Sequence, residues 1–201
     1  VIHSGLYYPP GSAKAVLCTR GRALLYEFCK SHGVAHQACG KLVVATDTHQ
    51  HVALQGLQAR AAVNGVALDW LTAVQARALE PALHCTAALW SPSTGIVDSH
   101  GLMSALQGDL ERHGGAVALK STVQSASFSV AGPAHVQVAS VDGDFELLAD
   151  LVVNAAGLQA CALARCFAGL DPAHVPQPRY AKGNYFSLMG RSPFSRLIYP
   201  A

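Results

Sequence analysis

His3 is the residue of this 201-residue chain whose type and surroundings best suit acid–base chemistry. It lies in an apolar, glycine-bearing run that leads into Tyr7-Tyr8-Pro9-Pro10. A neutral imidazole in such a run could accept a proton near physiological pH. The alternative is a structural histidine that donates to a backbone carbonyl, and taken alone the residues favour this alternative.

Two further segments carry residues that could contact a ligand. In Lys182-Gly183-Asn184-Tyr185-Phe186, a cation and a phenol lie on a predicted strand, with Lys182 and Asn184 on one face and Tyr185 on the other. The segment could bind a carboxylate, although a solvated strand edge is the commoner arrangement. In Asn154-Ala155-Ala156-Gly157, small residues join a predicted strand to a predicted helix, where a backbone can approach a ligand closely. A tight strand-to-helix turn explains those residues equally well.

The strong motifs for cofactors and metals do not occur. No two of the 18 glycines are separated by one residue, so the G-x-G-x-x-G fingerprint of dinucleotide binding is absent. The P-loop, H-E-x-x-H and G-x-S-x-G motifs are absent as well. We interpret residues 47–51 (Asp-Thr-His-Gln-His) as a solvated helix cap and residues 142–144 (Asp-Gly-Asp) as a hairpin turn, and we predict no metal site. The six cysteines form no C-x-x-C pair and are expected to be buried, reduced thiols.

Capping residues and hydrophobic periodicity predict the elements that position these segments. Ser12 is expected to begin a helix that runs to about residue 32, with Leu17, Leu24, Leu25 and Phe28 on its apolar face. Further helices are predicted over 50–64, 72–80, 98–113 and 157–168. Strands are predicted over 41–46, 87–90, 117–120, 123–130, 135–140, 145–148 and 151–154, with an extended segment from 180 onward. Helices and strands that alternate around a central meander predict an α/β or mixed α+β fold.

The composition excludes several classes of protein without indicating a function. With 51% hydrophobic and 13% charged residues, the chain is not intrinsically disordered. Its net charge of +2 is too balanced for a nucleic-acid binder that relies on counterion release. No apolar run reaches the roughly 18 residues of a membrane span, and no signal peptide is recognised. Because both methionines are internal and the apolar run at 196–201 has no following strand to pair with, we expect an interior piece of a longer protein.

The blocks Val1-Ile2-His3-Ser4-Gly5, Lys41-Leu42-Val43-Val44-Ala45 and Asn154-Ala155-Ala156-Gly157 occur in this order along the chain. Together with further segments, they resemble the L-2-hydroxyglutarate dehydrogenase/oxidase family, which belongs to the FAD-dependent, D-amino-acid-oxidase-like superfamily. The Val-Ile-His-x-Gly and Lys-Leu-Val-Val-Ala blocks are fairly specific to this subgroup, whereas Asn-Ala-Ala-Gly is shared across the superfamily. The family's glycine-rich fingerprint and its final segment over the flavin are both missing, so the resemblance implies a middle fragment. The matching blocks follow the family order and span nearly the whole chain: 1–8, 12–15, 39–45, 94–98, 154–158 and 182–186.

The resemblance implies FAD as the cofactor and two interleaved domains. A partial, Rossmann-like FAD-binding domain would comprise 1–39 and 97–168, and a partial, antiparallel-sheet substrate domain would comprise 40–96 and 169–201. By position, Ile2 and His3 would lie against the isoalloxazine. Val123 would lie on the strand that meets the adenine end, and Ala156 and Gly157 would let the backbone approach the cofactor.

The implied reaction is the oxidation of a small 2-hydroxy acid such as L-2-hydroxyglutarate. Hydride would leave C2 for flavin N5 while His3, acting as the base, takes the hydroxyl proton. A dicarboxylate substrate needs cationic or donor partners at both ends, for which Lys182 is the first candidate and Tyr185 the second. Arg191 and Arg196 are further candidates or simply surface residues. The electron acceptor (oxygen, quinone or another carrier) stays open.

Two other functions remain open from the sequence. The protein could be an amine or amino-acid oxidase of the same superfamily, acting on a C–N bond. Alternatively, the 201 residues by themselves could be a truncated, non-enzymatic fragment that cannot hold FAD. A binding module unrelated to flavoproteins is opposed by the ordered series of matching blocks. We expect a cytoplasmic location, with peripheral membrane attachment through an electron acceptor as the alternative.

Overall fold

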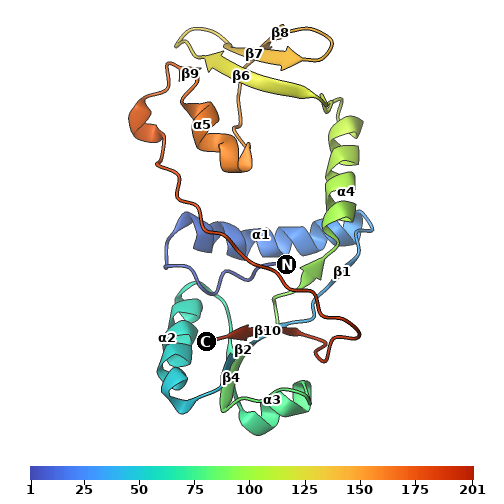
Figure 1. The fold of residues 1–201 in the computed structure, drawn as a ribbon, viewed down its shortest axis with the longest axis vertical. Coiled ribbons are helices and arrows are strands. Elements are labelled where there is room, and N and C mark those ends of the chain that lie inside the picture. Colours follow the sequence, from blue (N-terminus) through green and yellow to red (C-terminus); the bar gives the residue numbers. More distant parts are fainter. The chain divides into compact units, whose positions relative to one another are not determined.

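The computed structural model describes residues 1–201, which form two compact units. Unit 1 comprises Val1–Gly115 and Ser187–Ala201, and unit 2 comprises Ala116–Phe186. Both contain helices and strands (Figure 1), so the predicted mixed α/β class is confirmed. The units are defined by packing and carry no assignment to cofactor or substrate, so the predicted domain boundaries stay a prediction.

A four-stranded sheet forms the centre of unit 1. Its strand order is β10 (Leu197–Pro200), β2 (Lys41–Ala45), β4 (Ala87–Ser91) and β3 (Asp69–Thr72). β10 pairs parallel with β2, and the other two pairings are antiparallel. Apolar residues of α2 (His51–Val63) pack on one face and those of α3 (Ala73–Leu79) on the other (Figure 1). Because both faces are covered, β2 is buried along its whole length.

The helix starts in unit 1 agree with the capping residues in the sequence. Ser12 caps α1 (Ala13–Ser31) by accepting from the Ala15 N–H at 3.2 Å. Thr72 forms the capping box of α3, and Asp98 caps α4 (Ser99–Arg112). The predicted apolar face of α1 is only partly right, since Leu25 and Phe28 are partly buried but Leu17 and Leu24 are 67% and 52% exposed. The buried residues of α1 are Ala15 and Cys29.

Three very short elements complete unit 1. β1 (His36–Gln37) and β5 (Ile96–Val97) form an antiparallel two-stranded ribbon, and a 3₁₀ turn, η1 (Thr48–Gln50), precedes α2. Asp47 caps η1 by accepting from the His49 N–H at 2.8 Å, which confirms the predicted helix cap at this segment. No helix of the structure has the length and apolar character needed to cross a membrane.

Unit 2 is built on a second four-stranded sheet. β6 (Ser121–Ser127), β7 (Ala134–Ser140) and β8 (Phe145–Ala149) form an antiparallel meander, and β9 (Phe167–Ala168) adds in parallel to β6. Its small core consists of Ala126, Val136 and Val138. The predicted hairpin turn at Asp142-Gly143 is confirmed, with Gly143 at φ +116°. The remaining elements are the 3₁₀ turns η2 (Gly157–Gln159) and η3 (Pro172–His174) and the short helix α5 (Ala160–Ala164).

Several predicted elements are wrong in their extent or existence. Residues 117–120 and 151–154 form no strand, and neither does the segment 180–186. The helix predicted to run to residue 168 ends at Ala164, because Phe167 and Ala168 pair with β6. The run at 196–201, expected to have no partner, contributes β10 and pairs with β2. A strand depends on the segment it pairs with, and local pattern does not reveal that segment.

The cysteines are all free, but only Cys29 is buried and Cys166 is exposed, so the expected general burial is also wrong.

Candidate functional site

The backbone around His3 is fixed on both sides. Ile2, which is fully buried, forms a two-way bridge with Gly95: its N–H donates at 2.7 Å and its carbonyl accepts at 3.1 Å. Ser4 is also buried, and its hydroxyl accepts from Thr94 Oγ1 at 3.0 Å. His3 therefore lies between two anchored neighbours, both held by the turn that follows β4. With its side chain buried, Ile2 could reach a cofactor only through its main chain.

The His3 imidazole is half-buried and held in one orientation. Its Nδ1 accepts from the Gly5 N–H at 3.0 Å, where Gly5 has the left-handed φ of +87°. The ring stacks on Tyr8 with 5.2 Å between centroids and meets Tyr7 edge-on at 6.0 Å. Because Nδ1 is an acceptor, the neutral ring carries its proton on Nε2. This differs from the structural histidine considered above, which would donate to a backbone carbonyl.

Lys41 is an unusual residue of unit 1, because it is a nearly buried cation. It is 6% exposed and begins the central strand β2. Its Nζ lies 5.2 Å from the centroid of the Tyr7 ring and 4.8 Å from that of Tyr199 on β10. None of the five ion pairs of the protein includes Lys41. Burial lowers its pKa, since no carboxylate compensates for the lost hydration.

The Tyr7 hydroxyl beside this lysine is also unsatisfied. It is the only buried side-chain oxygen or nitrogen without a hydrogen-bond partner. Leaving such a group unpaired costs about 1–3 kcal/mol, so its presence needs a reason. Burial, with a smaller contribution from Tyr199, raises the pKa of Tyr7 to about 12. The phenol is therefore neutral at physiological pH and keeps its proton for donation.

Burial and the charge of Lys41 both act on His3. Burial is the larger cause and Lys41 the second, and together with the amino group of Val1 they lower the pKa of His3. A free imidazole titrates near about 6.5, so His3 is neutral at physiological pH. His3, Tyr7, Lys41 and Tyr199, which we call the His3–Lys41 cluster, thus combine a neutral imidazole, a neutral phenol and an unpaired cation. This is chemistry suited to an anionic substrate that loses a proton.

Sequence reasoning identified His3 but not the other members of this cluster. From the sequence, Lys41 belongs only to a predicted strand and to the Lys-Leu-Val-Val-Ala block of the resemblance, and Tyr7 is only a neighbour of His3. The signal that could have revealed Lys41 is its position as a lone charge at the start of an otherwise apolar strand, Lys41–Ala45. Tyr199 had no such signal, because its place beside Lys41 depends on β10 pairing with β2.

The residues expected near FAD in unit 2 are brought together in part. Val123 and Ala156 line one pocket of about 480 Å³, formed by β6, the start of η2 and α5. Gly157 follows Ala156 with a left-handed φ of +56°. Asn154 fixes this junction, because its Nδ2 donates to the Ala160 carbonyl at 2.8 Å. The lining is of small, apolar and uncharged polar residues, and the volume is within the usual range for ligands. These residues fit a cofactor that is held largely through main chain and shape.

The residues expected to bind substrate carboxylates are less well placed. Lys182 and Tyr185 lie in an irregular, exposed segment of unit 2, and Tyr185 is 98% exposed. Arg191 is also exposed. Arg196 already has a structural partner, because its Nη1 lies 3.2 Å from Oε1 of the buried Glu80. A role for Lys182 and Tyr185 in binding stays a prediction.

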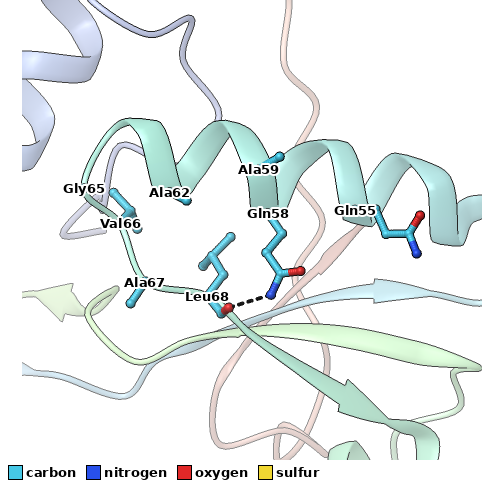
Figure 2. A pocket seen from close by; sticks show the side chains of 8 residues that line it. All are labelled: Gln55, Gln58, Ala59, Ala62, Gly65, Val66, Ala67 and Leu68. Atoms are coloured by element: carbon cyan, nitrogen blue, oxygen red, sulfur yellow. Dashed lines mark hydrogen bonds between the residues drawn. The ribbon is translucent and has the colours of Figure 1, made fainter.

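A further pocket of about 640 Å³ lies between α2 and residues 65–68 (Figure 2). Figure 2 shows that its lining includes two amides, Gln55 and Gln58, and that Gln58 Nε2 donates to the Leu68 carbonyl at 2.8 Å. The other lining residues are Ala59, Ala62, Gly65, Val66, Ala67 and Leu68. No titratable side chain lines this pocket, so it offers no acid, base or cation to a substrate.

Comparison with known proteins gives the class to which this fold and site correspond. The whole chain, residues 1–201, matches the family described as DAO, FAD dependent oxidoreductase. The chain belongs to this family of FAD-dependent oxidoreductases, as the resemblance of its motifs predicted.

Among the relatives are proteins named L-2-hydroxyglutarate dehydrogenase. The mitochondrial protein of Arabidopsis thaliana is 36% identical over 100% of this chain and 47% of its own length. The protein of Escherichia coli K12 is 31% identical over 100% of this chain and 46% of its own length. The mitochondrial human protein is 33% identical over 94% of this chain and 42% of its own length. The chain therefore spans about half the length of the curated relatives it matches.

Solved structures of the same fold support the architecture. L-α-glycerophosphate oxidase from Mycoplasma pneumoniae, a structure with FAD bound, has a TM-score of 0.74 at 20% identity and covers 83% of this chain and 44% of its own. Glycine oxidase from Geobacillus kaustophilus has a TM-score of 0.68 at 22% identity, over 82% of this chain and 45% of the oxidase chain. At this level of identity the likeness concerns the fold alone, which is the Rossmann-like fold of FAD-dependent oxidoreductases.

Proposed function

We propose that the protein oxidises a small 2-hydroxy acid, such as L-2-hydroxyglutarate, with FAD as its cofactor. The observation that carries this proposal is the His3–Lys41 cluster, in which a neutral imidazole lies near an unpaired, nearly buried cation. Relatives at 31–36% identity along the whole chain bear the name of that dehydrogenase, which favours this substrate over other anions.

The residues of unit 2 that would hold FAD are Val123, Ala156 and Gly157. Val123 and Ala156 line the uncharged pocket described above, and Gly157 leaves the main chain beside it without a side chain. When bound, FAD supplies the two-electron acceptance that oxidation of a C–H bond requires. The chain holds no glycine-rich fingerprint for the pyrophosphate. We therefore expect the 201 residues alone to purify colourless, and a yellow product with flavin absorbance would contradict this.

His3 is our candidate for the group that accepts the hydroxyl proton of the substrate. Its low pKa keeps a lone pair available at neutral pH. That lone pair is on Nδ1 and is used by the Gly5 N–H. To act as a base, the ring must give up the hydrogen bond from Gly5. It can then accept a proton at Nδ1, or move its own proton from Nε2 to Nδ1 and accept at Nε2. Lys182 and Tyr185 remain our proposed partners for a substrate carboxylate, and their exposure leaves them accessible to a ligand.

The competing function is oxidation of a C–N bond in an amine or amino acid. Glycine oxidase is among the proteins that share the fold, but at 22% identity it supports no more than the architecture. The two functions are separated by anaerobic bleaching of the flavin in the full-length protein. We expect L-2-hydroxyglutarate to bleach it, whereas glycine, sarcosine and D-amino acids leave it oxidised. Bleaching by an amino acid but not by the hydroxy acid would contradict the proposed function.

A further inference from the structure

We propose that Lys41 binds a carboxylate of the substrate, the one next to the reacting carbon, between the rings of Tyr7 and Tyr199. The inference rests on the function proposed above and adds the site that recognises the negative charge. The observation behind it is that Lys41 is 6% exposed and yet has no ion-pair partner in the protein.

Most of the Lys41 side chain is buried, but its Nζ is not among the fully buried atoms that lack a partner, so the ammonium is still open to a ligand. It needs more than the two aromatic rings provide. The rings of Tyr7 and Tyr199 attract the charge at 5.2 and 4.8 Å. The two rings offer no strong acceptor to the three N–H donors of the ammonium. No side chain or carbonyl of the protein accepts a hydrogen bond from these donors. A carboxylate would both accept these donors and neutralise the charge, which is the stronger, charge-assisted kind of hydrogen bond. The lowered pKa of Lys41 agrees with a cation that lacks its anion.

The position of Lys41 relative to His3 suggests which carboxylate it takes. The Tyr7 ring borders both groups, with its centroid 6.0 Å from that of the His3 ring and 5.2 Å from Lys41 Nζ. The positive charge of Lys41 also lowers the pKa of His3. In a 2-hydroxy acid, the hydroxyl and one carboxylate are on adjacent carbons. A cation and an imidazole separated by one ring can therefore serve these two groups of a single small molecule.

Equilibrium binding of glutarate to the full-length, FAD-loaded protein tests this proposal without any turnover. Glutarate is a five-carbon dicarboxylate that lacks the hydroxyl, and its uncharged diamide, glutaramide, is the control ligand. We expect calorimetry to show glutarate binding and no glutaramide binding. Lys41→Met should weaken glutarate binding by about 10- to 100-fold, the range for losing one charge-assisted hydrogen bond. Lys41→Arg, which keeps the charge, should restore much of the affinity.

Lys30→Met is the matched control, because it removes one positive charge from an exposed position of α1. It should leave glutarate binding within about twofold, since exposed charges are strongly screened. At one glutarate concentration, glutarate should also raise the unfolding temperature of the wild-type protein and of Lys30→Met by more than that of Lys41→Met. Equal glutarate affinity in wild type and a folded Lys41→Met would overturn the proposal, as would tight binding of glutaramide.

The outcomes separate this inference from the proposed function. If glutarate binds in a Lys41-dependent way but L-2-hydroxyglutarate does not bleach the flavin, the carboxylate site is supported and the substrate assignment falls. If L-2-hydroxyglutarate bleaches the flavin and Lys41→Met binds glutarate normally, the function is supported and the role of Lys41 is overturned.

Discussion

At the scale of single residues, the state of the His3 imidazole decides which role it can have. The Gly5 N–H donates to Nδ1, so the neutral ring presents Nε2–H to its surroundings. In this tautomer Nε2 is a hydrogen-bond donor, and proton acceptance needs a rearrangement of the ring or of Gly5. A donor and a base are therefore distinct roles that substitutions can separate.

The first prediction uses that distinction. His3→Ala in the full-length protein should slow flavin reduction by the substrate by about 10²- to 10⁴-fold, as expected for a lost base. Glutamine keeps an N–H donor on a side chain of similar reach but cannot take up a proton at neutral pH. His3→Gln should therefore be as slow as His3→Ala in anaerobic stopped-flow measurements. If His3→Gln retains most of the rate, His3 acts as a donor and its role as base is wrong.

The second prediction concerns the pH dependence of this step. Burial, then Lys41, lowers the pKa of His3, so the active, neutral ring is lost only when the pH falls below about 6.5. The acidic limb of kcat/KM, which reports the free enzyme, should lie below that value. Lys41→Met removes a positive charge near the ring and should move the limb to higher pH. A limb that stays in place in Lys41→Met would show that Lys41 does not act on the titrating group.

At the scale of elements, the Glu80 carboxylate connects α3 to the segment that leads into β10. Glu80 is buried and accepts from the Ser195 N–H at 3.1 Å, from the Ser195 hydroxyl at 2.7 Å and from Arg196 at 3.2 Å. Burial opposes ionisation of this carboxyl, but the hydrogen bonds outweigh it and lower the pKa of Glu80. Because these contacts immediately precede β10, they also help to hold Tyr199 beside Lys41.

The third prediction follows from these contacts. Glu80→Gln should lower the free energy of unfolding by about 1–3 kcal/mol at neutral pH, because charged hydrogen bonds become neutral or are lost. The exposed Glu27→Gln on α1 is the control and should change it by less than about 0.5 kcal/mol. With a folded pKa below the unfolded value of about 4.3, the Glu80 contribution is complete above that pH. It should vanish as the pH falls through the lower, folded pKa. Denaturant unfolding of the wild type and of Glu80→Gln at pH 7 and pH 3 measures both effects. If the two proteins differ in free energy of unfolding by the same amount at both pH values, the assignment to Glu80 is contradicted.

Which elements could be predicted depends on how local their causes are. Ser12, Thr72 and Asp98 cap helices through neighbours two or three residues away, so the sequence predicts these starts, with Ser99 as the alternative to Asp98. The short strands β1, β3 and β5 were missed because they exist through pairing with distant segments. Segments 117–120 and 151–154 have strand-like composition but no pairing partner.

The same reasoning applies to the candidate site. His3 was identifiable because a histidine in an apolar run is conspicuous in a sequence. The environment of Lys41 was not, since Tyr199 reaches it only through the parallel pairing of β10 with β2, more than 150 residues further along the chain. Strand pairing assembled a cation site that no local motif describes.

At the scale of the whole molecule, two helices of unit 1 carry several exposed apolar side chains. Val16, Leu17 and Leu24 are exposed on α1, and Met103, Leu106 and Leu110 are exposed on α4. Leu17 and Leu24 are two of the residues predicted from periodicity to face a core. Contiguous exposed apolar patches of this kind usually mark a surface that another part of a protein covers. The chain spans about half the length of its curated relatives, and we predict that in a protein of that length further polypeptide covers the α1 face.

The last prediction tests this cover directly. In a protein of the relatives' full length, Leu24→Gln should lower the free energy of unfolding by about 1.5–3 kcal/mol, the value of burying a leucine side chain. Lys30→Gln places the same side chain at an exposed charged position of the same helix and should change it by less than about 0.5 kcal/mol. Denaturant unfolding of both variants, at several protein concentrations, gives the comparison. If Leu24→Gln changes the free energy of unfolding as little as Lys30→Gln does, the exposed apolar face of α1 stays in water. The apolar periodicity of α1 then has no structural consequence. If the effect of Leu24→Gln depends on protein concentration, a second copy of the protein is the cover instead.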